Sequence, residues 1–160
     1  MAILTSESVI DELAIRELAA RFSDAVNRRD GAQIAELFIP EGRWNVPGVP
    51  ETVGHAAIES AFGALVGQFP FLVQLLHSGV VELDGERATA RWYLSEHARG
   101  ADGGGSLFVG YYEDELVRSA GEWRFQVRTF HFLYRGRDEL PGRPYPHANP
   151  KETGGEAAAP

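Results

Sequence analysis

The sequence predicts a single α+β domain, in which helices from the first half of the chain pack on a sheet formed by the second half. Up to about residue 67, apolar residues recur at helical spacing, whereas after Pro70 they alternate with a period of two. A chain of 160 residues with 44% hydrophobic residues is also long enough to build one core. These observations together favour helices closing one face of an antiparallel sheet.

Three helices are expected before Pro70. The first covers residues 5–28, the second residues 30–38 and the third residues 54–67. The first helix has a main apolar stripe of Ala14, Leu18, Phe22 and Ala25. A short strand at residues 43–46 and a Pro-rich loop at residues 47–50 separate the last two helices.

Four strands are expected after Pro70. They cover residues 71–83, 87–99, 107–117 and 123–134, and the Asp84-Gly85 pair is a strong hairpin signal between the first two. A second tight turn at residues 119–122 joins the last two strands, where Gly121 supplies a positive φ.

Alternation assigns the side chains of the last strand to the two faces of the sheet. Trp123, Phe125 and Val127 are expected on one face, and Arg124, Gln126 and Arg128 on the other. From Phe130 to Tyr134 the alternation is lost, which indicates either a strand covered on both faces or a bulge that changes its phase.

Composition excludes several classes of function. The formal charge of −8 argues against nucleic acid as a partner. The sequence has neither a polybasic run nor an apolar run of about 20 residues, so association with a membrane is not expected. There is no cysteine, and the first thirty residues do not resemble a signal peptide, so a cytoplasmic protein is expected. The five histidines are far apart in sequence and no dinucleotide fingerprint is present, so neither a metal nor a cofactor is expected.

The chain beyond residue 135 has a different composition. Residues 136–160 are rich in Pro, Gly and charge, and they are expected to form an extended tail after a domain of residues 1–135. This tail is expected to wrap the domain, to pack on a partner or to stay loose.

Two side chains are candidates for acid–base chemistry. One is His77, in the run Leu75-Leu76-His77-Ser78-Gly79, because a histidine side chain suits a general base or acid near neutral pH; alternatively, it is a hydrogen-bonded core residue. Asp24 lies on the flank of the first helix's apolar stripe, where a solvated carboxylate is the alternative.

Several short motifs together resemble the SnoaL-like branch of the nuclear transport factor 2-like superfamily. They are residues 22–30 (FSDAVNRRD), Leu37-Phe38, Gly42-Arg43-Trp44, Gly54 with Ile58 and Phe62, His77, Asp84-Gly85 with Ala88 and Ala90, Gly110-Tyr111-Tyr112, and Gly121 to Phe125. The resemblance covers about residues 5–135. It implies a cone-shaped fold, in which a curved antiparallel or mixed sheet wraps around three helices and encloses an apolar pocket.

The resemblance also implies roles for individual residues. In dehydratase-like members an Asp of the first helix and a His of the following strand form a catalytic dyad, and Asp24 and His77 take the matching positions. Ser23 stands where scytalone dehydratases have a Tyr, so the same substrate is not implied. Tyr112, preferred over Tyr111 as the inward hydroxyl, and Arg128 are further catalytic candidates; a solvated Arg128 is the alternative. The candidate pocket residues are Phe22, Trp44, Phe62, Trp92, Phe108 and His131.

Three functions remain open at this point. The first is a cofactor-independent lyase or isomerase, such as a dehydratase, a ketosteroid isomerase-like or a polyketide cyclase-like enzyme, acting on a small apolar cyclic molecule by His/Asp acid–base catalysis. The others are a non-catalytic small subunit of a ring-hydroxylating dioxygenase and a small-molecule-binding module. A homodimer is expected through the sheet face that carries Arg91 and Tyr93.

Overall fold

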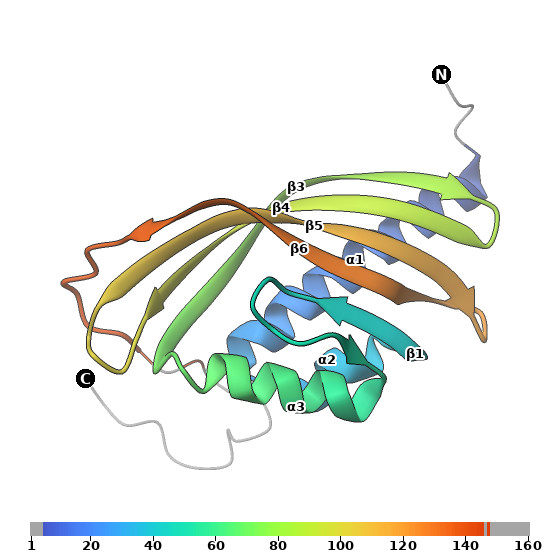
Figure 1. Cartoon of the computed structure of the whole chain (residues 1–160). Coiled ribbons are helices and arrows are strands. Elements are labelled where there is room, and N and C mark those ends of the chain that lie inside the picture. The colour runs from blue at the N-terminus through green and yellow to red at the C-terminus, as the bar shows by residue number, and fades with distance from the viewer. Residues whose placement is uncertain (1–4, 146, 148–160) are drawn as a thin grey trace, which may run out of the picture.

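The computed structural model describes residues 5–145 and residue 147, which form three helices and one sheet of six strands (Figure 1). In chain order the elements are α1 (Ser6–Arg28), α2 (Gly31–Glu36), β1 (Phe38–Asn45), β2 (Thr52–Val53), α3 (His55–Val66), β3 (Phe71–Asp84), β4 (Arg87–Arg99), β5 (Gly105–Ser119) and β6 (Glu122–Arg137). The strand order is β2-β1-β6-β5-β4-β3, and β1 runs parallel to β6 while the other neighbours are antiparallel. The long strands bend near their middle and the helices lie on the concave side (Figure 1), so the predicted α+β class with a curved mixed sheet is confirmed.

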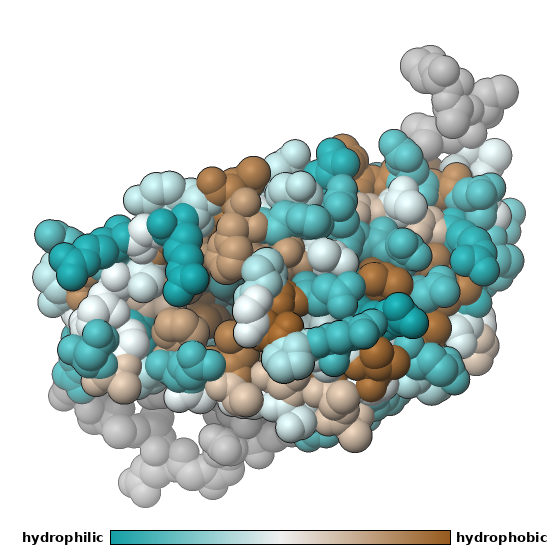
Figure 2. Space-filling view, in the orientation of Figure 1, coloured by the Kyte–Doolittle hydropathy of each residue, from teal (hydrophilic) through white to brown (hydrophobic). Residues whose placement is uncertain are grey.

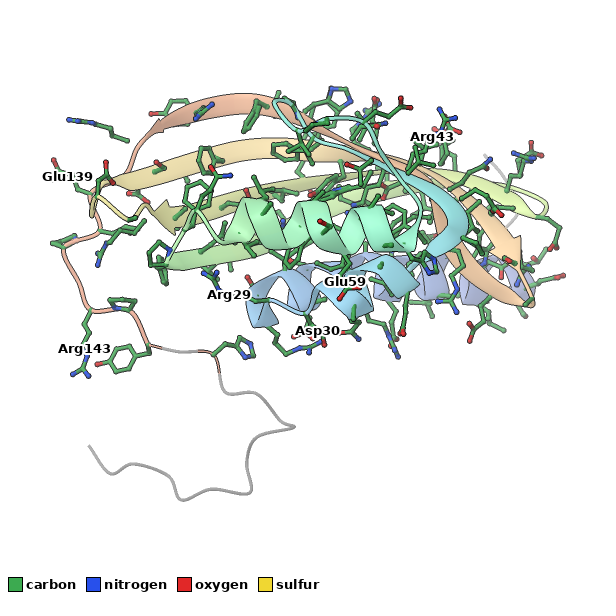
Figure 3. The ribbon with its side chains drawn as sticks, turned by 60° about the horizontal axis from the view of Figure 1, so that its bottom comes forward. Arg29, Asp30, Arg43, Glu59, Glu139 and Arg143 are labelled. Carbon is green, nitrogen blue, oxygen red and sulfur yellow. The ribbon has the colours of Figure 1, made fainter. Side chains whose placement is uncertain are left out.

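Local sequence signals determine where α1 begins and ends. Thr5 and Ser8 form a reciprocal capping box at the start of the helix, which satisfies backbone N–H groups that have no partner within the helix. Arg29 takes a left-handed conformation (φ 59°) at the other end. From there its Nη1 donates to the Val66 carbonyl at 3.0 Å, which ties the end of α1 to the end of α3 (Figure 3).

The core is centred on the ring of Phe22, which is fully buried on α1. Its ring makes edge-to-face contacts with the rings of Phe38, Trp44, Tyr112 and Phe125, at centroid distances between 5.5 and 6.4 Å. Such arrangements satisfy the ring quadrupoles in addition to burying apolar area. The helix and the sheet are therefore held together by aromatic residues that come from α1, β1, β5 and β6.

A bulge in β6 overturns the predicted direction of Arg128. Glu115 pairs with Val127 and Leu116 pairs with Phe125, so Gln126 is an extra residue in β6. The extra residue changes the phase of the strand, and Arg128 returns to the inner face on which Phe125 lies. Both the expected outward direction and the alternative of a solvated Arg128 are therefore wrong, because this side chain is fully buried.

The buried Arg128 sits among aromatic rings and beside one carboxylate. Its guanidinium carbon lies 3.9 Å from the centroid of the Tyr112 ring and 4.2 Å from that of Phe22. Its Nη1 lies 3.6 Å from Oδ2 of Asp114, which is also buried. Burial raises the pKa of Asp114 to about 6, although the nearby Arg128 opposes this rise.

The start of the predicted tail is joined to the sheet. β6 continues to Arg137, two residues past the predicted domain boundary. Oδ2 of Asp138 lies 2.6 Å from Nδ1 of His97. Arg99 donates hydrogen bonds to the carbonyls of Leu140 and Gly142. Figure 3 shows Glu139 and Arg143 on this segment as it leaves the sheet. The rest of the predicted tail, residue 146 and residues 148–160, lies outside the described residues. Among the described helices, none is long and apolar enough to cross a membrane.

Candidate functional site

An apolar pocket of about 280 Å³ lies between the curved sheet, α3 and the loop that joins β1 to β2. Its apolar wall includes Trp44, Phe62, Phe69, Leu72, Phe108 and Phe130. The space-filling view shows apolar side chains in the hollow left of centre, with hydrophilic side chains around it (Figure 2). A concave apolar chamber with few polar groups is the usual form of a small-molecule site.

Two polar side chains from neighbouring strands lie side by side in the pocket wall. Gln74 of β3 and Glu96 of β4 are partners in the sheet register, and the Nε2 of Gln74 donates to Oε1 of Glu96 at 2.7 Å. Burial raises the pKa of the Glu96 carboxyl, while the hydrogen bond from Gln74 lowers it. The pocket therefore holds a carboxylate whose proton affinity is above the ordinary value, as a general base needs.

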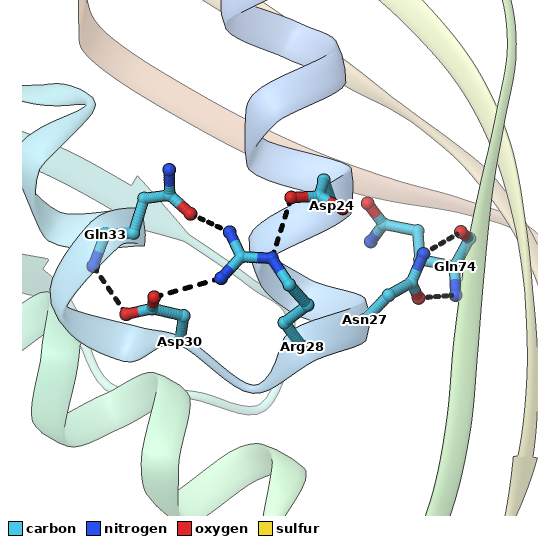
Figure 4. A network of polar contacts seen from close by, with 6 residues as sticks. All are labelled: Asp24, Asn27, Arg28, Asp30, Gln33 and Gln74. Atoms are coloured by element: carbon cyan, nitrogen blue, oxygen red, sulfur yellow. Dashed lines mark hydrogen bonds and ion pairs between the residues drawn. The ribbon is translucent and has the colours of Figure 1, made fainter. Parts of the chain in front are cut away.

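Asn27 of α1 fixes the position of Gln74. Its Nδ2 donates to the Gln74 carbonyl at 2.9 Å, and its Oδ1 accepts from the Gln74 amide N–H at 2.7 Å (Figure 4). The hydroxyl of Ser23 adds a longer contact of 3.4 Å to the same carbonyl. Because β3 is an edge strand, this paired contact satisfies backbone groups that have no strand beside them.

One polar atom in the pocket wall, Oε1 of Gln74, is buried and has no hydrogen-bond partner among residues 5–145 and 147. Nε1 of Trp44 is also buried, but it lies close enough to the Tyr112 hydroxyl for their interaction to oppose the rise that burial causes in the pKa of Tyr112. Buried polar groups in folded proteins are almost always paired. The free acceptor of Gln74 is therefore suited to a hydrogen-bond donor that enters the chamber.

Tyr112 brings a hydroxyl to the same chamber. The side chain lines the pocket, whereas Tyr111 lies on the outer face and stacks on His131 at a centroid distance of 4.8 Å. Burial raises the pKa of Tyr112 above its ordinary value, and the Arg128 charge behind its ring opposes that rise. The phenol therefore stays protonated at neutral pH and acts as a hydrogen-bond donor.

The structure does not bring Asp24 and His77 together. Asp24 points away from β3 and accepts from Nε of Arg28 at 2.8 Å, with 55% of its side chain exposed (Figure 4). Nε2 of His77 lies 2.8 Å from Oγ of Ser95, and this side chain is exposed. Neither residue lines the pocket, and in the described part of the chain no hydrogen bond joins them. The expected contact between the two is therefore wrong.

His77 lies directly after two inward side chains of β3, Gln74 and Leu76, at the start of a second bulge. Leu76 pairs with Leu94 and Gly79 pairs with Trp92, so two residues of β3 face one residue of β4. His77 falls in this bulge on the outer side of the sheet. Gly79 packs so closely on the ring of Trp92 that a Cβ there would lie 2.0 Å from it, which fixes the register after the bulge.

The remaining predicted residues divide into two groups. Trp44, Phe62 and Phe108 line the pocket together with Tyr112. Phe22, Trp92 and Arg128 are buried but lie behind the pocket wall, and His131 lies on the outer face with its Nε2 3.1 Å from Oε2 of Glu113.

Sequence analysis missed the polar residues of the pocket, although one signal was present. Ala88, Ala90, Trp92 and Leu94 alternate on the inner face of β4, and the next step of this alternation is Glu96. In the described residues no group of three or more His, Asp or Glu is arranged to hold a metal ion.

Comparisons with known proteins identify relatives of this fold. A family model described as a SnoaL-like domain matches residues 7–129. The uncharacterized protein Rv2910c of Mycobacterium tuberculosis (strain ATCC 25618 / H37Rv) is 25% identical over 131 residues, which cover 80% of this chain and 89% of that protein.

Solved structures with the same fold include proteins of different activities. A candidate aromatic ring hydroxylase from Novosphingobium aromaticivorans has a TM-score of 0.74 and 24% identity, covering 81% of this chain and 94% of that one. A candidate scytalone dehydratase from the same species has a TM-score of 0.75 and 16% identity, covering 86% and 93%. The hexachlorocyclohexane dehydrochlorinase LinA-type3 from Novosphingobium barchaimii has a TM-score of 0.75 and 16% identity, covering 86% and 94%. At these identities the likeness supports the fold alone.

Proposed function

Because the chain belongs to the SnoaL-like family, we propose that it is a cofactor-independent lyase or isomerase that acts on a small, mainly apolar cyclic molecule. The single observation that carries this proposal is the carboxylate of Glu96, which lies in an apolar chamber and is held there by Gln74. The family match supports the class, and solved structures with the same fold include a candidate dehydratase and a dehydrochlorinase. Both names describe the removal of a small molecule from a carbon skeleton.

Proton abstraction from carbon is the step that this pocket supports. Glu96, with its raised pKa, takes the proton from a carbon next to an electron-withdrawing group. The protonated phenol of Tyr112 donates to the oxygen on which negative charge develops. Loss of a leaving group then gives a lyase, and return of the proton at another carbon gives an isomerase.

This mechanism moves the acid–base role expected of His77 to Glu96. The reaction class expected from the sequence is retained, but Asp24 and His77 lie outside the chamber in which a substrate would sit. Gln74 takes the part of the orienting residue, because its amide donates to one carboxylate oxygen and leaves the other oxygen free to accept a proton.

Turnover by matched variants tests the proposal. The unmodified protein is screened against hydroxylated cyclic ketones, sterols and polyketide-like compounds, and kcat and KM are measured on the best substrate. Glu96→Gln should lower kcat by about 10²–10⁴, the usual worth of general acid–base catalysis. Glu82→Gln on the outer face of β3 is the control and should leave kcat unchanged. Full turnover by the Glu96→Gln protein would reject Glu96 as the base.

A small-molecule-binding module is the second candidate function. The preformed apolar pocket favours it, because a binding protein needs such a chamber and no catalytic group. This candidate predicts a ligand that binds stoichiometrically and is recovered unchanged after prolonged incubation, whereas the lyase or isomerase converts it. A non-catalytic oxygenase subunit needs no open chamber and is less well supported by a pocket of about 280 Å³.

A further inference from the structure

The pocket carries a positive charge as well as the carboxylate of Glu96. Among the described residues that line it, Glu96 and Arg135 are the two with a formal charge. Glu96 pairs with Phe108 across β4 and β5, and Phe108 pairs with Arg135 across β5 and β6. The three residues therefore form one row across the inner face of the sheet. At a strand spacing of about 4.8 Å, the backbones of Glu96 and Arg135 lie roughly 10 Å apart.

A bulge in β6 turns Arg135 to this face. Gly110 pairs with Phe132 and Val109 pairs with Tyr134, so Leu133 is an extra residue in the strand. Phe132 lines the pocket before the bulge and Arg135 lines it after the bulge. Under simple alternation from Phe132, Tyr134 would face the pocket and Arg135 would face away from it.

Within the described residues, the guanidinium of Arg135 contacts an aromatic ring and no charged group. The guanidinium carbon lies 5.7 Å from the centroid of the Phe108 ring, and no hydrogen bond or ion pair joins this side chain to another residue within the described ranges. The chain has an excess of acidic residues, with 23 Asp and Glu against 15 Lys and Arg, yet no carboxylate of residues 5–145 and 147 forms an ion pair with this arginine. An exposed arginine at a pocket lined mostly by apolar side chains is suited to bind an anionic group of a ligand.

We propose that the pocket takes an amphiphilic anion, with an apolar ring system that carries one carboxylate or a similar acid group at its end. The acid group pairs with Arg135 at the mouth, the rings lie along Phe108, and the opposite end of the molecule lies at Glu96. Repulsion from Glu96 disfavours the reverse orientation, so the two charges set the direction in which the ligand enters. This proposal rests on the proposed function, because it names the substrate class of the same chamber.

Two fluorescent probes that differ by one acid group test the proposal. 8-Anilino-1-naphthalenesulfonate and N-phenyl-1-naphthylamine share their ring systems, and only the first carries a sulfonate, which represents the acid group of the ligand. Dissociation constants for both are measured by fluorescence titration at fixed ionic strength. Arg135→Gln should weaken binding of the sulfonate about tenfold, the expected value of a charge-assisted hydrogen bond, and change binding of the neutral probe less than about twofold.

Arg137→Gln serves as the matched control. Arg137 lies two residues further along β6 and is exposed, but it does not line the pocket, so its removal changes the net charge equally. Both probes should bind this variant as they bind the unmodified protein. Equal weakening of both probes by Arg135→Gln, or the same loss of sulfonate affinity in Arg137→Gln, would overturn the role of Arg135 while leaving the chamber intact. Failure of both probes to bind the unmodified protein would instead reject the chamber, and the proposed function with it.

Discussion

Replacement of Asn27 by alanine should weaken the fold by an amount that can be worked out from its contacts. The variant loses two hydrogen bonds to the backbone of Gln74, at 2.9 and 2.7 Å. The Gln74 carbonyl keeps the hydroxyl of Ser23, whereas the Gln74 N–H keeps no partner. A lost hydrogen bond costs about 1 kcal/mol and an orphaned buried donor about 1–3 kcal/mol, so the free energy of unfolding should fall by about 2–4 kcal/mol. For a chain of this size, the Tm should fall by roughly 5–15 °C.

Urea unfolding followed by tryptophan fluorescence measures this change. Asn45→Ala is the matched control, because Asn45 donates a single 3.2 Å hydrogen bond to the side chain of Thr129 and should cost about 1 kcal/mol. The m-value should be the same in all three proteins if the folded and unfolded states keep their exposed areas. The reasoning is refuted if Asn27→Ala is no more destabilising than Asn45→Ala, since the contact to β3 would then carry no special weight.

Two further predictions concern pH and assembly. Burial raises the pKa of Asp114 to about 6, so the stability due to its bound proton is complete below about pH 4 and is lost as the pH rises through 6. At 1.36 kcal/mol per pKa unit, this loss of stability is at most about 3 kcal/mol. The Asp114→Asn variant should not show the loss when its free energy of unfolding is measured in urea between pH 4 and 7. The assignment is contradicted if the free energy of unfolding of this variant changes with pH as much as that of the unmodified protein. The outer sheet face, on which Tyr93 is 40% exposed beside Tyr111, should pair two copies of the chain. Sedimentation should show a dimer that Tyr93→Glu dissociates, and a 17.6 kDa species alone at micromolar concentration would contradict the pairing.

Periodicity was sufficient to predict the three helices before Pro70 and the four long strands after it. The change from helical spacing to alternation near Pro70 corresponds to the boundary between α3 and β3. The turn at Gly121, which has a φ of 83°, lies where the predicted hairpin requires it. Such elements depend on interactions between residues close in sequence, which is why they could be predicted.

Site residues were harder to predict because β-bulges reverse the direction of a side chain without a clear mark in the sequence. The bulge at Gln126 turns Arg128 inward, although simple alternation assigned it to the outer face. His77 was placed in the pocket by the family resemblance, whereas alternation from the inward side chains of Gln74 and Leu76 puts it on the outer face. Glu96 lies on a regular strand, and alternation would have placed it correctly had a charged residue been accepted at an inner position.

The extra residue Leu133 makes the polarity of the pocket depend on the register of the last strand. Regular pairing of the same residues, without the bulge, would place Leu133 opposite Val109 and Tyr134 opposite Phe108. A neutral phenol would then stand where the cation stands, and Arg135 would face away from the pocket. Deletion of Leu133 would instead remove the bulge and leave Tyr134 and Arg135 on their present faces. A slip of one residue at the end of β6, with no substitution, would therefore convert the proposed chamber for acids into a chamber for neutral molecules.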